Sequence, residues 1–245
     1  MSDERHKPSV AAIVPCFNER DTIVACVRGL LAFREISCVA VADDGSSDGS
    51  PLLCAREARA SGGRLKLFTL PCNMGKNAAV RHAARRVEAD VVIVFDADLT
   101  VDAGEIPAVL ALVEKEPGSF VYATRFRGPV AQSAMPRLRR WGNRILAAWV
   151  SRLTRRRMTD ALCGLKALPR DVLLSRRMAR CRWGDLDLIF AAAEAGLAFR
   201  EIPVAYRARP AGTSKMNLLG AGASFAAQCL AYGLCAPSSR GKAAK

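Results

Sequence analysis

Short hydrophobic runs recur along the first half of the chain, and each is followed by a longer stretch with helical spacing of apolar positions. The runs are rich in β-branched residues and apolar on both faces, as in strands buried within a parallel sheet. The pattern predicts strands over 10–14, 37–42, 65–70, 91–95 and 119–124, separated by helices over 19–33, 50–60, 76–89 and 103–115. Such alternation is typical of β-α-β units, so we predict an α/β fold with a mostly parallel central sheet flanked by helices.

The regular alternation ends after residue 124, and a basic amphipathic helix is predicted over 137–157. Apolar side chains recur on it at helical spacing beside a stripe of arginines: Leu138, Trp141, Ile145, Trp149, Arg137, Arg140 and Arg144. This pattern is typical of a helix that lies on an anionic membrane surface. It also fits a solvated basic helix packed on the core.

The remaining chain predicts a strand over 163–168, a helix over 185–196, a strand over 199–208 and a loop over 209–217. A final helix over 218–237 is apolar but contains glycines, a serine and a glutamine, which favours a surface position over a membrane span. We therefore expect one domain over 1–217, including the basic helix at about 134–157. Residues 218–245 are expected to form an interfacial helix and a basic tail.

The charge balance of the chain points to anionic partners. Lys and Arg number 37 against 23 Asp and Glu, giving a net charge of +14. Nucleic acid, anionic lipid and phosphorylated substrates all fit such a balance. The arginines crowd onto one tryptophan-bearing helix, however, and no nucleic-acid-binding module is recognisable, so nucleic acid is the remote alternative and we expect none as a partner.

The sequence lacks the residues that several classes of enzyme need. His6 and His82 are the only histidines, which leaves little support for a histidine zinc site or a Ser-His-Asp triad. No G-x-G-x-x-G follows the first strand, which argues against a dinucleotide-dependent dehydrogenase. The nine cysteines form no C-x-x-C pair and no signal peptide precedes them, as expected of reduced thiols in the cytoplasm.

Polar motifs follow three of the predicted strands: "PCFNE" after the first, "DDGSSDG" after the second and "DAD" after the fourth. Carboxyl ends of parallel strands meet at one sheet edge, where ligands bind. Asp96 and Asp98 would project to the same side, and two such anions repel unless a cation lies between them. A divalent metal completed by phosphate oxygens would resolve this conflict, whereas the alternative is that Asp98 or Asp102 only caps the next helix.

Together with "RPAGTSK" at residues 209–215, these motifs resemble the inverting family 2 glycosyltransferases of GT-A fold over roughly residues 8–217. Within that family the chain is most similar to polyprenyl-phosphate hexosyltransferases, such as the dolichol-phosphate mannose and dolichol-phosphate glucose synthases. The resemblance implies a Rossmann-like GT-A sheet, amphipathic helices on a membrane surface, and Mg²⁺ or Mn²⁺ as cofactor. It implies transfer of a hexose from UDP-glucose or GDP-mannose to a polyprenyl monophosphate, with a soluble or cell-envelope saccharide as the alternative acceptor.

Residue by residue, the resemblance implies a nucleotide-sugar site at Pro15, Phe17, Glu19, Ala42, Asp44, Asp96, Ala97, Asp98, Arg209 and Lys215. The implied metal ligands are Asp96 and Asp98. The implied catalytic residues are Asp98, Arg125, Asp187, Arg209 and Lys215. Of these, Arg125 matches an arginine near the acceptor phosphate, while Arg209 and Lys215 match a pair that binds the diphosphate.

The chain departs from the family pattern at three positions. Thr100 stands where the family often has Gln or Ser, which puts a third side-chain metal ligand in doubt, and Asn77 stands where a glycine is frequent. Ala179 replaces the glutamine of the Q-x-x-R-W signature, which argues against a polysaccharide-polymerising enzyme. The run "TDALCGLKAL" is similar to the glucosyl branch and favours UDP-glucose as donor.

The expected partners follow from the resemblance and the charge. They are a nucleotide-sugar, a polyprenyl phosphate and an anionic membrane surface, with a membrane protein as a further candidate. We expect a cytoplasmic protein that associates peripherally with the inner face of the membrane.

Overall fold

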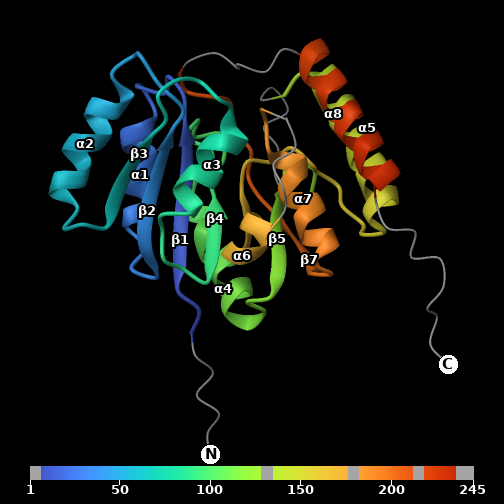
Figure 1. Cartoon of the computed structure of the whole chain (residues 1–245), viewed down its shortest axis with the longest axis horizontal. Coiled ribbons are helices and arrows are strands. Elements are labelled where there is room, and N and C mark those ends of the chain that lie inside the picture. The colour runs from blue at the N-terminus through green and yellow to red at the C-terminus, as the bar shows by residue number, and fades with distance from the viewer. Residues whose placement is uncertain (1–6, 128–134, 176–181, 212–217, 236–245) are drawn as a thin grey trace, which may run out of the picture.

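A seven-stranded sheet forms the centre of the molecule, and helices cover both of its faces (Figure 1). The computed structural model describes residues 7–127, 135–175, 182–211 and 218–235. The strands are β1 (Val10–Cys16), β2 (Ile36–Asp43), β3 (Leu65–Thr69), β4 (Val91–Val94), β5 (Ser119–Thr124), β6 (Lys166–Pro169) and β7 (Ala198–Pro203). The helices are α1 (Ile23–Leu31), α2 (Ser50–Ala60), α3 (Lys76–Ala84), the 3₁₀ turn η1 (Ala103–Glu105), α4 (Ile106–Lys115), α5 (Arg137–Thr154), α6 (Arg170–Ser175), α7 (Asp185–Glu194) and α8 (Leu218–Cys235).

The strand order is β3-β2-β1-β4-β6-β5-β7. Strands β1 to β4 pair in parallel, as does β5 with β7. Among the described strands, β6 alone runs antiparallel to its neighbours, between β4 and β5. The predicted mostly parallel α/β sheet is therefore confirmed, but β4 and β5 are not neighbours, because a strand that comes later in the chain separates them.

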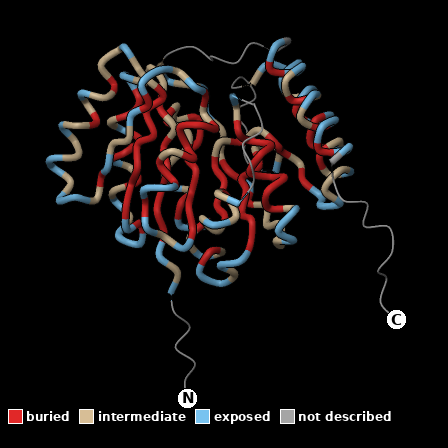
Figure 2. Tube along the Cα trace, viewed as in Figure 1, coloured by how far each residue is buried: buried red, intermediate tan, exposed pale blue. Residues whose placement is uncertain are grey.

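Period-two alternation along the strands builds a core on each face of the sheet. In β1, Ala11 and Ile13 face one core, whereas Val10, Ala12 and Val14 face the other. The first core is closed by α3, α5, α6, α7 and α8, and the second by α1, α2 and α4. Figure 2 shows the buried strands enclosed by helices that are exposed on their outer sides. Both faces of the central strands are thus shielded from water, as their doubly apolar sequences predict.

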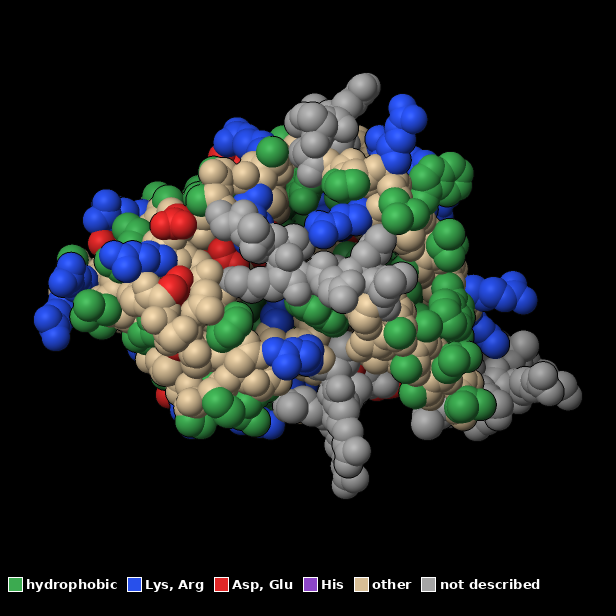
Figure 3. Space-filling model, turned by 90° about the horizontal axis from the view of Figure 1, so that it is seen from above, with side chains coloured by type: hydrophobic (Ala, Val, Ile, Leu, Met, Phe, Trp, Pro, Cys, Tyr) green, Lys and Arg blue, Asp and Glu red, His purple; other side chains and the backbone are tan. Residues whose placement is uncertain are grey.

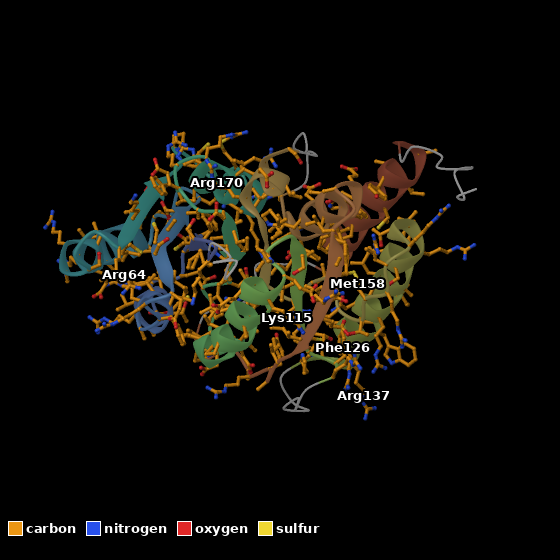
Figure 4. All side chains as sticks on the ribbon, turned by 90° about the horizontal axis from the view of Figure 1, so that it is seen from below. Arg64, Lys115, Phe126, Arg137, Met158 and Arg170 are labelled. Carbon is orange, nitrogen blue, oxygen red and sulfur yellow. The ribbon has the colours of Figure 1, made fainter. Side chains whose placement is uncertain are left out.

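Some elements end earlier than the hydrophobic pattern predicts. The helix expected to reach residue 89 stops at Ala84, where the Nε of Arg170 donates a 2.7 Å hydrogen bond to the Ala84 carbonyl. This bond satisfies one of the carbonyls that a helix end leaves open. The last predicted strand ends earlier, at Pro203, although the backbone N–H of Val204 still donates to the Thr124 carbonyl at 3.1 Å. The guanidinium of Arg64 donates to three carbonyls that connect α1 to β2, a contact that local periodicity does not reveal (Figure 4).

Helices α5 and α8 lie side by side at one end of the sheet (Figure 1). The inner side of α5 buries Asn143, Leu146, Ala147 and Val150. The inner side of α8 buries Ala221, Phe225, Cys229 and Tyr232 in the same core. In the described part of the chain, no helix has both the length and the hydropathy needed to span a bilayer.

The docking of α8 can be tested through Tyr232, whose ring stacks on Phe190 of α7 at 4.0 Å between centroids. Tyr232 is 7% exposed, whereas Leu234, two residues later, is 86% exposed. We expect Tyr232→Ala to lower the free energy of unfolding by about 3 kcal/mol, as truncation of a buried aromatic usually does. Leu234→Ala should change it by less than about 0.5 kcal/mol. Denaturant unfolding of both variants measures the difference, and equal losses would mean that α8 is not part of the folded core.

Candidate functional site

A cavity of about 920 Å³ opens where β1, β2, β4 and β5 end. Acidic and basic side chains lie near the middle of the face seen in Figure 3, and hydrophobic side chains gather on the side of α5 and α8. The charged residues of the cavity wall are Glu19, Asp44, Lys76, Asp96, Asp98, Arg125, Arg139, Arg182, Asp185 and Arg209. The sheet edge predicted to hold the site is therefore the edge at which the cavity lies.

Hydrogen bonds join the loops that follow β1 and β2. The backbone N–H of Asn18 donates to Ser46 Oγ at 2.8 Å, and that of Glu19 donates to Ser50 Oγ at 3.1 Å. Asp48 accepts from the backbone N–H and the hydroxyl of Ser50 at the start of α2. Much of "DDGSSDG" thus builds the loop itself.

Asp44 lines the cavity, but both of its oxygens already accept hydrogen bonds. They accept from the backbone N–H groups of Met74 and Gly75 at 2.7 and 2.8 Å, which fixes the loop after β3. Burial raises the pKa of Asp44, and these two N–H groups oppose the rise. Ala42 is buried within β2 and is not part of the cavity wall.

Asp96 and Asp98 face the cavity, and each carboxylate contacts a cation. Asp96 Oδ1 lies 2.7 Å from Lys76 Nζ, and Asp98 Oδ2 accepts a 2.8 Å hydrogen bond from Arg209 Nη2. Burial raises the pKa of Asp96, Lys76 opposes this, and the neighbouring charge of Asp98 adds to the rise. The predicted repulsion between the two acids is thus present, and protein cations compensate it.

The turn after Asp98 is strained. Leu99 has a φ of 56°, in the left-handed region that costs an L-residue about 1 kcal/mol or more. Asp98 Oδ1 holds this turn by accepting from the backbone N–H and the hydroxyl of Thr100 at 3.0 and 2.7 Å. The hydroxyl of Thr100, whose role as a metal ligand the sequence put in doubt, is therefore engaged in orienting Asp98.

Arg209 connects two acidic residues across the cavity. Besides Asp98, its guanidinium contacts Glu19 Oε1 at 3.2 Å, so the chain after β7 is tied to the turn after β1. Arg209 is thus placed among the residues predicted to bind the nucleotide. Lys215, its predicted partner, lies outside the described residues.

A chain of alternating charges leads from Asp96 into the protein. Lys76 Nζ lies 3.4 Å from Asp185 Oδ1, and Lys166 Nζ lies 2.7 Å from the same oxygen. Burial alone would raise the pKa of Asp185, but Lys166 and Lys76 outweigh it and lower the pKa. Asp187, two residues after Asp185, is not part of the cavity wall. Its carboxylate accepts a 2.5 Å hydrogen bond from Asn77 Nδ2. The residue that replaces the family's frequent glycine therefore binds the carboxylate for which we predicted a catalytic role.

Gly164 leaves room for the Asp96 side chain. A Cβ added to Gly164 would lie 2.7 Å from the Cβ of Asp96 and closer still to its carboxylate. Real Cβ atoms do not approach other atoms so closely, so any larger residue would displace Asp96.

Arg125 is held in place by the buried carboxylate of Asp160, which lies between α5 and β6 in the chain. Its Nε and Nη2 donate to the two oxygens of Asp160 at 2.6 and 2.8 Å, and its guanidinium lies 5.2 Å from the ring centre of Tyr206. Burial would raise the pKa of Asp160, but the charge of Arg125 outweighs it and lowers the pKa. Asn143 of α5 donates to the same carboxylate at 2.6 Å.

The far end of the cavity is apolar. It is lined from α5 and α8 by Leu138, Ile145, Leu146, Trp149, Ala221, Phe225 and Ala226. The cavity is therefore amphipathic, because most of its charged groups lie at the sheet edge, whereas the wall from α5 and α8 is mostly apolar and includes Arg139 and Asn143 of α5.

Most of the predicted residues meet in this one cavity wall: Pro15, Phe17, Glu19, Asp44, Asp96, Ala97, Asp98, Arg125 and Arg209. Sequence reasoning assigned no role to Lys76, Asn143, Asp160 or Gly164. One signal was available, because Asn143 is a polar residue on the apolar side of α5.

The donor set fits a hard divalent cation. Carboxylate oxygens are the ligands that Mg²⁺ and Mn²⁺ prefer, and Asp96 and Asp98 supply them on one side of the cavity. Among the described residues, no group of three or more Asp, Glu, His or Cys could hold an ion alone. A metal at this position would therefore need further oxygens from water or from a bound phosphate.

The family model described as "Glycosyl transferase family 2" matches residues 11–174. An undecaprenyl-phosphate 4-deoxy-4-formamido-L-arabinose transferase of Pseudomonas fluorescens is 32% identical over 212 residues, covering 85% of this chain and 60% of that protein. The Edwardsiella ictaluri protein of the same name is 28% identical, covering 89% of this chain and 66% of its own length. The chain thus spans less than two thirds of these relatives.

Solved structures share the fold. The crystal structure of glucosyl-3-phosphoglycerate synthase from Mycobacterium tuberculosis, in complex with Mn²⁺, UDP and phosphoglyceric acid, has a TM-score of 0.70 with 18% sequence identity. The match covers 95% of this chain and 80% of that one. The predicted GT-A fold is confirmed by this likeness.

The contact between Gly164 and Asp96 leads to a test of the metal site. We expect Gly164→Ala to weaken Mn²⁺ binding by about tenfold or more, an amount equal to ~1.4 kcal/mol, because the new Cβ displaces the Asp96 carboxylate. Gly118→Ala is the control, since nothing lies within 4 Å of a Cβ added there. Electron paramagnetic resonance measures free Mn²⁺, and thermal unfolding reports on the fold. Unchanged Mn²⁺ affinity in a folded Gly164→Ala protein would show that Asp96 is not a ligand or is not confined by Gly164.

Proposed function

The chain belongs to glycosyl transferase family 2, and from this premise we propose that it transfers a sugar from a nucleotide-sugar to a polyprenyl monophosphate at a membrane surface. The observation that carries the proposal is the amphipathic cavity, which runs from Asp96 and Asp98 to the apolar walls of α5 and α8. A nucleoside diphosphate suits the charged end, and a prenyl chain suits the apolar end. A polar saccharide acceptor would leave the apolar end without a matching ligand.

The names of the relatives agree with this acceptor, since two of them are undecaprenyl-phosphate transferases. Arg125 supports it further, because only one edge of its guanidinium binds Asp160. No described residue bonds its Nη1, which is left to bind an anion such as the acceptor phosphate. For the donor we propose UDP-glucose, with GDP-mannose as the alternative.

The proposed reaction needs little proton transfer. A phosphate oxygen of the acceptor, already anionic at neutral pH, forms a bond to the anomeric carbon, while the bond from that carbon to the diphosphate breaks. The nucleoside diphosphate leaves with the electron pair, and attack from the opposite face inverts the anomeric centre. Arg209, which contacts Glu19 and Asp98 in this structure, would bind the diphosphate as the negative charge of the diphosphate grows.

Asp96 and Asp98 would hold a Mg²⁺ or Mn²⁺ ion, which supplies Lewis-acid stabilisation of the leaving diphosphate when bound. Lys76 contacts Asp96 and, together with the metal ion, would neutralise the negative charge of the site. We propose Lys215 as a second cation for the diphosphate, by the family likeness alone.

We propose that α5 faces an anionic membrane, which would place the protein at the inner face of the bilayer. Leu138, Trp141 and Ile145 are 67, 63 and 65% exposed, although they are apolar. Exposed arginines flank them, as on helices that bind anionic lipid. Arg140 and Arg144, two of the predicted basic stripe, also lie over the ring of Phe126, at 6.0 and 5.6 Å.

The catalytic proposal is tested by transfer of radiolabelled sugar into an organic-solvent extract containing undecaprenyl phosphate. Asp96→Asn and Asp98→Asn should each lower the rate by roughly two orders of magnitude or more, as loss of a strong electrostatic stabiliser does. EDTA should abolish transfer and Mn²⁺ or Mg²⁺ restore it. Asp102→Asn is the matched control, because this neighbouring acid caps η1 outside the cavity. Label that stays in the aqueous phase with every sugar-nucleotide would refute the lipid acceptor.

The membrane proposal is tested by sedimentation with anionic vesicles. Trp141→Ala combined with Ile145→Ala should weaken vesicle binding severalfold, because both side chains are exposed and apolar. Leu52→Ala on α2 removes an equally exposed apolar side chain, 60% exposed, from a distant helix and should have no effect. Equal binding of both variants would show that α5 is not the membrane contact.

A further inference from the structure

Asp160 receives more hydrogen bonds than any simple ion pair requires. Its oxygens accept from the backbone N–H, Nε and Nη2 of Arg125, from Asn143 Nδ2, and from the backbone N–H of Leu162. Asp160 is fully buried, and the Arg125 side chain is 12% exposed. Such a network holds a guanidinium in one orientation.

Asn143 is the member of this network that comes from the membrane-facing helix. It is 4% exposed, and its carbonyl oxygen accepts from the backbone N–H of Ala161 at 3.3 Å. The exposed residues Trp141 and Ile145 lie within two positions of it on α5. A buried amide here needs partners, and both of its partners belong to the segment that holds Arg125.

A second contact connects α5 to the chain beside Arg125. The ring of Phe126, next to Arg125 in the chain, lies under the guanidinium groups of Arg140 and Arg144. Figure 4 shows Phe126 and Arg137 at the same end of the molecule, where α5 begins. Helix α5 therefore contacts both the side-chain anchor of Arg125 and its backbone neighbour.

We propose that Asn143 is a positioning residue. Its hydrogen bond to Asp160 connects α5 to Arg125 and so orients the Nη1 of Arg125 toward the acceptor phosphate. This inference rests on the proposed function, because it takes the anion bound by Arg125 to be a prenyl monophosphate. It adds that the helix proposed to face the membrane also orients the phosphate-binding group.

The test compares binding of farnesyl phosphate and farnesol, which differ only by the phosphate, by isothermal titration without donor. Asn143→Leu, close in shape to asparagine, should weaken farnesyl phosphate binding about tenfold, which equals ~1.4 kcal/mol, and leave farnesol binding unchanged. Asn143→Ser, too short to reach Asp160, should do the same and serves if the leucine variant does not fold. Val150→Ala, at a fully buried apolar position of the same helix, is the control and should alter neither affinity.

A double-mutant cycle separates positioning from general damage to the fold. Arg125→Lys keeps a positive charge beside Asp160 but loses the fork geometry. In that background, Asn143→Leu should weaken farnesyl phosphate binding less than about twofold, because Asn143 acts through the guanidinium. Additive losses would overturn the inference, as would unchanged farnesyl phosphate binding in folded Asn143→Leu. Equal wild-type affinity for farnesyl phosphate and farnesol would instead overturn the proposed acceptor, and the inference with it.

Discussion

Charge compensation among crowded carboxylates is the constraint on which the cavity is built. Asp96, Asp98 and Asp185 line the same cavity, where like charges repel and desolvation makes each anion costly. Lys76, Lys166 and Arg209 come from three other elements and neutralise these acids. Each of these ion pairs compensates a carboxylate, and a charged ligand can replace such a contact with one of its own.

The segment from Asp160 to Lys166 supports this arrangement of charges through several contacts. Asp160 holds Arg125, Gly164 gives Asp96 its space, and Lys166 anchors Asp185. One short stretch thus contacts three cavity-lining side chains, two of which follow β5 and β4 while the third begins α7. Leu162, Cys163 and Gly164 of this stretch line the cavity, and substitutions here would disturb several of these contacts together.

The sequence predicted those features that are local. Period-two and helical patterns located β1 to β5 and the helices between them, because each depends on neighbours a few positions away. Acidic motifs at strand ends indicated the cavity, since parallel strands bring their carboxyl ends together. The antiparallel insertion of β6 and the pairing of Lys76 with Asp96 depend on contacts between distant parts of the chain. Asn77 shows the limit well: its departure from the family pattern was visible, but its bond to Asp187 was not.

The place of β6 in the sheet has a consequence for how the protein is made. On the ribosome, β4 and β5 emerge first, yet they never pair with each other, because β6 separates them. Until residue 169 has left the exit tunnel, both strands present open edges of unpaired backbone groups, the kind of surface on which nascent chains aggregate. The basic helix α5 is synthesised within this interval. The N-terminal half therefore cannot complete its sheet alone, and the edges of β4 and β5 that will flank β6 stay without it until that strand has been made.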